Sequence, residues 1–127
     1  MIRKLILSLV CATALVPAAQ AHHSFAMFDM DKTVTLDATV ESFKWAMPHV
    51  WLYVVIQTAS GPQQWGMECH SPNIIARKGW TSKSVQPGDK VKVTMHPKRD
   101  GTSSGSLIYI TLPDGTVLWN AESEGRV

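Results

Sequence analysis

Residues 34–45, VTLDATVESFKW, carry the pattern that decides the fold. Up to Val40 every second residue is apolar, which is typical of a β-strand with one buried face. After Ser42 the apolar positions are Phe43 and Trp45, so the alternation slips by one residue. Such a slip predicts a β-bulge, and a bulge lets a long strand bend around a barrel.

The chain after this strand predicts further strands and one short helix. The predicted strands cover residues 50–57, 63–70, 90–96 and 107–112, with a short terminal strand at 116–119. Ser71 suits a helix N-cap, Pro72 the first helical position and Gly79 the left-handed residue after the helix end. A helix between the third and fourth of five strands is the order of an OB-type barrel. We therefore predict an all-β fold with one short helix, an OB-type five-stranded Greek-key barrel, in preference to an open sandwich.

The first 21 residues have the layout of a secretory signal peptide. Two basic residues precede an apolar run at 5–16, and the segment ends in Ala19-Gln20-Ala21. The run is too short for a membrane-spanning helix, which needs about 20 residues. We predict cleavage after Ala21, a periplasmic or secreted protein, and no membrane span after cleavage.

Cleavage also changes the charge balance. The 127-residue chain has 12 basic and 10 acidic residues, and Arg3 and Lys4 leave with the signal peptide, so ten of each remain. A chain without excess positive charge gives no electrostatic footprint for nucleic acid, and we predict no nucleic-acid partner. The predicted organisation is an N-terminal arm at 22–33, one barrel domain at 34–119 and a flexible tail at 120–127.

Cys69 is the one cysteine that remains after cleavage, because Cys11 lies in the signal peptide. On the predicted strand it shares a face with Trp65 and Met67, which predicts a buried and unreactive thiol. His70 follows directly, but neighbours on a strand point to opposite sides. We therefore do not interpret the pair as a metal motif.

Several segments of the mature chain resemble one family of small exported bacterial proteins, known only as a domain of unknown function. These segments are HHSFAMFD, WAMPHVWLYV, SPNIIARKGW, PGDKVKV and DGTSSGSL with a following LPDG. The resemblance covers nearly the whole mature chain and implies an OB-type barrel without implying an activity. The chain departs from the family pattern at Met47, where we expect Asn, and at Cys69-His70, where we expect small or apolar residues.

Cleavage after Ala21 would make His22 the N-terminal residue, and this position suggests a metal site. A terminal histidine offers its α-amine and its ring Nδ1 as a chelate, and one more histidine completes the arrangement called a histidine brace. Such nitrogen ligands favour copper, with zinc as the alternative. The third ligand is His49, His96 or His23, and the sequence favours His49 because it lies in a loop at the expected barrel mouth.

Other residues near the histidines have supporting interpretations. Asp29 and Asp31 could orient a histidine ring from behind, although aspartates in turns more often accept structural hydrogen bonds. Met27, Met30 and Met47 are soft ligands for Cu(I), although methionine more often fills gaps in a core.

The alternative function is a binding module without metal. Trp51 and Tyr53 share a strand face and, with Trp45, predict an exposed aromatic binding face. OB-type proteins stack planar ligands on aromatic residues of this kind. The partner would be a periplasmic protein or a small molecule. The sequence contains no second group of catalytic residues, and we predict that the protein is not an enzyme.

Overall fold

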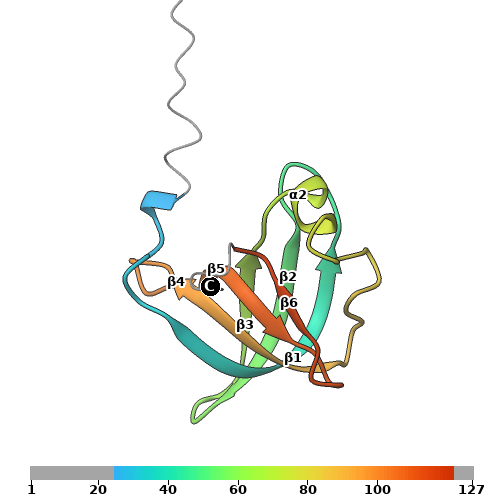
Figure 1. Ribbon diagram of the computed structural model, residues 1–127. Helices are drawn as coiled ribbons and strands as arrows, with labels where there is room; N and C mark the ends of the chain where they lie inside the picture. Colours follow the sequence, from blue (N-terminus) through green and yellow to red (C-terminus); the bar gives the residue numbers. More distant parts are fainter. Residues whose placement is uncertain (1–24, 122–127) are drawn as a thin grey trace, which may run out of the picture.

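The computed structural model describes residues 25–121, so the predicted signal peptide, His22 and His23 lie outside the described residues. Figure 1 shows the arrangement of the elements around a barrel. The strands are β1 (Val34–Lys44), β2 (Trp51–Thr58), β3 (Gly61–Glu68), β4 (Lys90–Pro97), β5 (Ser104–Thr111) and β6 (Val117–Trp119), and the helix α2 (Pro72–Ala76) lies between β3 and β4. Within residues 25–121, no helix has the length and apolar character needed to cross a membrane.

The first five strands form a closed barrel. The order of the sheet is β3-β2-β1-β4-β5-β6, and a further pairing joins β3 to β5. Residues 66–68 of β3 run parallel to residues 104–106 of β5 and so close the ring. The later part of β5 pairs with β6 instead. The predicted fold class, an all-β OB-type five-stranded barrel with one short helix, is confirmed.

Strand β1 bends as its sequence pattern predicts. Its first part pairs with β4 and its second part with β2, and Thr39 pairs with both Lys90 and Val55. The register with β2 shifts between Val40 and Ser42, where the alternation of apolar residues slips. The bulge therefore lets one strand serve two sides of the barrel.

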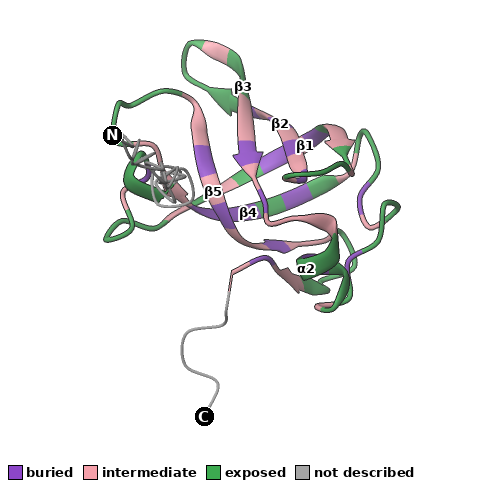
Figure 2. Ribbon diagram, turned by 90° about the horizontal axis from the view of Figure 1, so that it is seen from above, coloured by how far each residue is buried: buried purple, intermediate pink, exposed green. Residues whose placement is uncertain are grey.

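The core fills the barrel and one of its ends. The alternating apolar positions of β1, β2 and β4 include the buried residues Ala38, Val40, Leu52, Val54, Val91, Val93 and Met95, and Figure 2 shows buried stretches on several strands. Trp80, which follows α2, is buried, and its ring stacks on Phe43 with centroids 5.9 Å apart. Its Nε1–H donates to the carbonyl oxygen of Trp119 at 2.9 Å. The helix region thus closes the barrel end by packing one tryptophan beneath it.

The helix begins and ends close to the predicted residues. Pro72 occupies its first turn, and Gly79 has a φ of +96°, the left-handed region that favours glycine. Ser71 is the N-cap, but its side chain makes no capping hydrogen bond. Its carbonyl oxygen instead accepts the N–H groups of Ile74 and Ile75. The helix is therefore held by backbone bonds and by the buried Ile75.

Two polar residues are more buried than the sequence indicates. Thr94, which the alternation of Val91, Val93 and Met95 on β4 would turn outward, is buried, and its hydroxyl lies 2.9 Å from the hydroxyl of Thr35. Asn120, placed by the sequence in the flexible tail, is buried and accepts the N–H of His70 at 2.8 Å. Its amide group donates to the carbonyl oxygen of Leu107 at 2.7 Å. Asn120 therefore belongs to the barrel, because it links β5 to the segment after β3.

Residues 25–32, which we call the strap, lie against the segment that follows β4 (Figure 1). Phe28 forms an isolated antiparallel bridge with Lys98, and its side chain is buried. The N–H of Asp29 donates to the carbonyl oxygen of Pro97 at 2.8 Å, and the N–H of Arg99 donates to that of Met27 at 2.9 Å. These contacts anchor the described part of the predicted N-terminal arm.

Candidate functional site

Three polar side chains form a row across the outside of the barrel. Glu68 on β3 pairs with Ser106 on β5, and Ser106 pairs with His96 on β4. Their respective chain neighbours Met67, Leu107 and Met95 are buried in the core. Because neighbours on a strand point to opposite faces, the row points outward. Glu68 and His96 are two strand spacings apart, about 10 Å between their Cα atoms.

His49 lies in the loop between β1 and β2 and reaches the end of this row. Its Nδ1–H donates to the carbonyl oxygen of Cys69 at 3.1 Å. Its Nε2 atom lies 3.6 Å from Oε1 of Glu68. The ring is thus held between a backbone carbonyl group and a carboxylate.

His96 is held in a similar way at its Nδ1 atom. The Nδ1–H group donates to the carbonyl oxygen of Lys32, at the end of the strap, at 2.8 Å. A carbonyl oxygen only accepts, so Nδ1 carries a proton, and in the neutral ring Nε2 then holds a lone pair. This orientation is common for histidines that ligate metals. Among residues 25–121, Nε2 of His96 has no hydrogen-bond partner.

The predicted metal ligands are placed unequally. His22 and His23 lie outside the described residues. His49 and His96 are both positioned by backbone carbonyl groups, but the structure brings His49 to Glu68 and not to His96. Over residues 25–121, no three His, Cys, Asp or Glu side chains gather into a group that could hold a metal ion.

The two predicted supporting aspartates belong to the strap. Oδ1 of Asp29 lies 3.8 Å from Nη1 of Arg99, and Asp31 is exposed. The carboxylate of Asp29 thus faces an arginine of the adjacent loop. Its role in the described chain is to help hold the strap in place.

Cys69 is buried, as predicted, with 2% of its surface exposed. Burial raises the pKa of its thiol strongly, and the nearby charge of Glu68 raises it further. A thiol with a raised pKa forms little of the reactive thiolate. Because the N–H of Cys69 also donates to the carbonyl oxygen of Val50 at 2.9 Å, its place is structural.

Trp51 and Tyr53 form the exposed part of the predicted aromatic face. Both are half-buried, and their rings stack with centroids 6.0 Å apart and an interplanar angle of 17°. They lie over Gly66 of β3, where a Cβ atom would be only 3.4 Å from Cε1 of Tyr53. Nζ of Lys44 lies 5.3 Å from the centroid of the Tyr53 ring. The pair therefore forms a small aromatic platform with a cation at its edge.

Trp45 does not belong to this platform. Its ring lies 5.9 Å from that of Phe43 and packs against the core. Phe43 in turn stacks on Trp80 at the closed end of the barrel. The slip at the bulge explains the difference, since after Ser42 the residues Phe43 and Trp45 take the inward positions.

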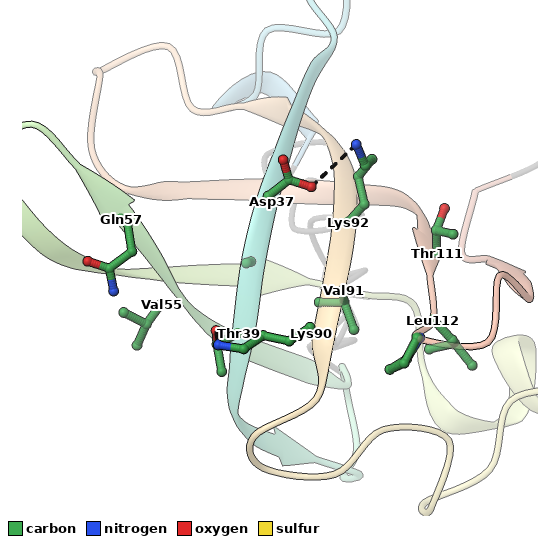
Figure 3. Close-up of a pocket in the computed structure, with 11 residues that line it drawn as sticks. Asp37, Thr39, Val55, Gln57, Lys90, Val91, Lys92, Thr111 and Leu112 are labelled. Carbon is green, nitrogen blue, oxygen red and sulfur yellow. Dashed lines mark hydrogen bonds and ion pairs between the residues drawn. The ribbon is translucent and has the colours of Figure 1, made fainter.

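A shallow hollow of about 490 Å³ lies over β1, β2, β4 and the end of β5 (Figure 3). The side chains of Lys92 and Asp37 form an ion pair of 3.3 Å at its edge. Nζ of Lys90 donates to Oγ1 of Thr39 at 2.7 Å. This hollow was not predicted from the sequence, in which the alternation of polar with apolar residues on these strands is the one signal for it.

The attachment of the strap to residues 96–99 was also not predicted from the sequence. The bonds of Met27, Asp29 and Lys32 to residues 96–99 use mainly backbone atoms, which leave no trace in residue types. Phe28, one of several apolar residues in the segment before β1, was the available signal.

Comparisons with known proteins give a similar solved structure and a family. A solved structure of a mitochondrial single-stranded DNA binding protein from S. cerevisiae, Rim1, is similar to this chain with a TM-score of 0.47 and 14% sequence identity. The match covers 71% of this chain and 97% of that chain. No curated protein matches. A family model described as "Family of unknown function (DUF6152)" matches residues 9–107, which is most of the chain, and the protein therefore belongs to this family.

Proposed function

We propose that this protein is an exported barrel, periplasmic or secreted, that binds copper through His22 after cleavage behind Ala21. Cleavage would free the α-amine of His22, and a terminal amine and an imidazole together form a chelate that suits copper better than zinc. The observation that carries the proposal is the state of His96, whose ring is held at Nδ1 by the strap while its Nε2 atom has no described partner. His23 assists in the proposed site.

The anchored strap limits where His22 can lie. The carbonyl group of Met27 accepts the N–H of Arg99. His22 precedes Met27 by five residues, so their Cα atoms are at most about 18 Å apart. His96 precedes Arg99 by three residues, about 10 Å of extended chain. Chain length therefore allows the terminal chelate to reach His96.

These facts favour His96 over His49 as the third ligand. The sequence alone favoured His49, which lies at the far end of the outer row. There its Nε2 atom already faces the carboxylate of Glu68 at 3.6 Å. We therefore propose His22 and His96 as the copper ligands, with His49 as the alternative third ligand.

The first test is a Cu(II) titration of the processed protein and of a variant with one extra glycine ahead of His22. The extension turns the α-amine of His22 into an amide and removes the chelate. We expect the Cu(II) affinity to fall by about tenfold or more, at least about 1.4 kcal/mol. Circular dichroism should show the same fold for both proteins. Equal affinities would place the site elsewhere.

The third ligand is tested with His96→Gln and His49→Gln. We expect His96→Gln to weaken Cu(II) binding and His49→Gln to leave it nearly unchanged, as measured by calorimetry and by electron paramagnetic resonance. The reverse order would assign the site to His49. Zn(II) titrated in parallel should bind more weakly than Cu(II).

Acid should release the metal, because the ligands bind in their deprotonated form. Imidazole has an ordinary pKa of about 6.5 and an α-amine one of about 7.7–8.0. We expect Cu(II) affinity to fall steadily as the pH decreases through these values. An affinity unchanged between pH 8 and pH 5 would argue against an amine and imidazole chelate.

The second candidate function is a binding module, favoured by the half-exposed platform of Trp51 and Tyr53. Its ligand would be a periplasmic protein or a planar small molecule. The mature chain has balanced charges, so we expect no binding of single-stranded DNA at physiological salt. Fluorescence anisotropy with a labelled oligonucleotide tests this, and tight, salt-sensitive binding that is lost in Trp51→Ala would contradict it.

A further inference from the structure

The hollow of Figure 3 lies on the outer face of the barrel, and none of its lining residues belongs to the proposed copper site. On β1, Asp37 and Thr39 flank the buried Ala38. On β4, Lys90 precedes the buried Val91. Because neighbours on a strand point to opposite faces, the polar side chains of this lining point outward. The volume of about 490 Å³ lies within the range of about 300–1,000 Å³ that is typical of sites for small molecules.

Lys90 brings a positive charge into this hollow that no carboxylate balances. Its Nζ atom donates to Oγ1 of Thr39, a neutral group, at 2.7 Å, and Figure 3 shows its side chain extending toward Thr39. Within residues 25–121 Lys90 forms no ion pair, and the carboxylate of Asp37 already pairs with Lys92 at 3.3 Å. The lining therefore carries two positive charges and one negative charge. An ammonium group has three N–H donors, so Lys90 can bind an anion as well as Thr39.

An apolar side chain and an amide group lie beside this ammonium group on β2. Val55 pairs with Thr39, and its side chain points outward because both of its chain neighbours are buried. Gln57 follows two residues later on the same face and is exposed. In the part of the chain that the structure describes, the side chain of Gln57 has no hydrogen-bond partner. This part of the hollow thus combines a cation, an amide donor and an apolar surface.

We propose that the hollow binds a small organic monocarboxylate. The carboxylate group accepts hydrogen bonds from Nζ of Lys90 and from the amide group of Gln57, and the hydrocarbon part lies on Val55. One negative charge matches the one positive charge that the lining leaves unbalanced, and hydrogen bonds between charged groups are stronger than neutral ones. The contact with Val55 distinguishes this ligand from an inorganic anion. The inference goes beyond the proposed function, and its test does not depend on copper.

The first experiment follows the backbone amide signals of ¹⁵N-labelled, processed protein by NMR at low salt. Butanoate is the probe, acetate is the shorter acid, and butylammonium is the probe of opposite charge. We expect butanoate to shift the signals of Thr39, Val55 and Lys90 and to saturate them at lower concentrations than acetate does. Butylammonium should give no saturating shift. Equal affinities for butanoate and acetate would show an adventitious anion site only, and absent shifts with butanoate would overturn the proposal outright.

The second experiment removes the charge of Lys90. The variant Lys90→Met keeps a linear side chain and loses the ammonium group. Because ion pairs at exposed positions are weak, we expect the butanoate affinity to fall by about three- to fivefold. Lys44→Met is the matched control, since Lys44 is exposed on the part of β1 beyond the bulge. Equal losses in the two variants would mean that only the net charge of the protein attracts the acid, which would refute the site.

The variant Asp37→Asn should change the affinity in the opposite direction. Loss of this carboxylate frees Lys92 from its ion pair and adds one positive charge to the hollow. We expect the butanoate affinity to rise by about three- to fivefold, with an unchanged circular dichroism spectrum. A damaged fold would lower the affinity, so an increase identifies the charge as the cause. An unchanged or lower affinity in Asp37→Asn would contradict the assignment of the ligand to this hollow.

Discussion

His49 and His96 show how the backbone prepares single side chains for chemistry. Each ring donates from Nδ1 to a carbonyl oxygen, at 3.1 Å for His49 and 2.8 Å for His96. These bonds fix the rotation of the ring and the position of its proton, so that Nε2 is the atom available for a ligand. The two residues differ in the surroundings of Nε2. In His49 this atom faces the carboxylate of Glu68, whereas in His96 it has no partner among the described residues.

Cys69 provides a prediction about alkaline pH. Burial and the charge of Glu68 raise the pKa of its thiol in the folded state. In the unfolded chain the thiol ionises near its ordinary pKa of about 8.5. A raised folded pKa gives stability that is complete below that value and is lost as the pH rises above it. Between pH 8 and pH 10, the free energy of unfolding should therefore fall by about 1.5–2 kcal/mol more in the wild type than in Cys69→Ala.

Urea unfolding of both proteins at the two pH values measures this difference. Because each protein is compared with itself at the two pH values, any pH-independent effect of the alanine on stability cancels. Identical losses in the two proteins would show that the thiol ionises equally in both states. Slow labelling of the native protein by a thiol reagent is expected as well, and fast labelling would contradict the burial of Cys69.

At the scale of elements, the alternation of apolar residues was sufficient to predict most of the barrel. The slip in β1, the buried positions of β4 and the place of the helix all follow from local patterns, which depend on neighbours in the chain. The burial of Asn120 and the attachment of the strap do not, because each depends on contacts between distant segments. For the same reason the sequence grouped Trp45 with Trp51, while the bulge turns Trp45 toward the core.

A substitution at Gly105 tests how closely the strands must pack where the barrel closes. Gly105 pairs with Met67 of β3 on one side and Pro97 of β4 on the other. A Cβ atom there would collide with the sulfur of Met95 and lie 2.9 Å from the carbonyl oxygen of His96. Backbone atoms yield little, so we expect Gly105→Ala to destabilise the fold by about 1–3 kcal/mol.

Gly66→Ala is the matched control for this prediction. Gly66 pairs with Ser104 in the same closing ladder, and its added Cβ would meet Tyr53 at an ordinary contact distance of 3.4 Å. We expect its free energy of unfolding to change by less than about 0.5 kcal/mol. Equal effects of the two substitutions in urea unfolding would mean that close packing at Gly105 does not govern closure.

At the scale of the whole molecule, the strap joins the N-terminal region to the barrel. It ties residues 27–29 to residues 97–99 and places the end of the described chain near β4 and its following loop (Figure 1). The proposed Cu(II) site depends on this attachment, since it would keep a terminal His22 within chain length of His96. The apolar contribution to the attachment comes from Phe28, which is 2% exposed.

Phe28→Ala should therefore weaken the attachment of the strap to the barrel. Removing a buried phenylalanine side chain costs about 3–5 kcal/mol in a well-packed core, and we expect about 3 kcal/mol here because the strap lies at the surface. Phe25→Ala is the control, because Phe25 belongs to the same strap and is 48% exposed. It should change stability by less than about 0.5 kcal/mol. At a temperature where both variants are folded, Phe28→Ala should also bind Cu(II) more weakly than Phe25→Ala, since a detached strap would no longer keep the proposed His22 chelate within reach of His96. Equal Cu(II) affinities in the two variants would show that copper binding does not depend on the attachment of the strap.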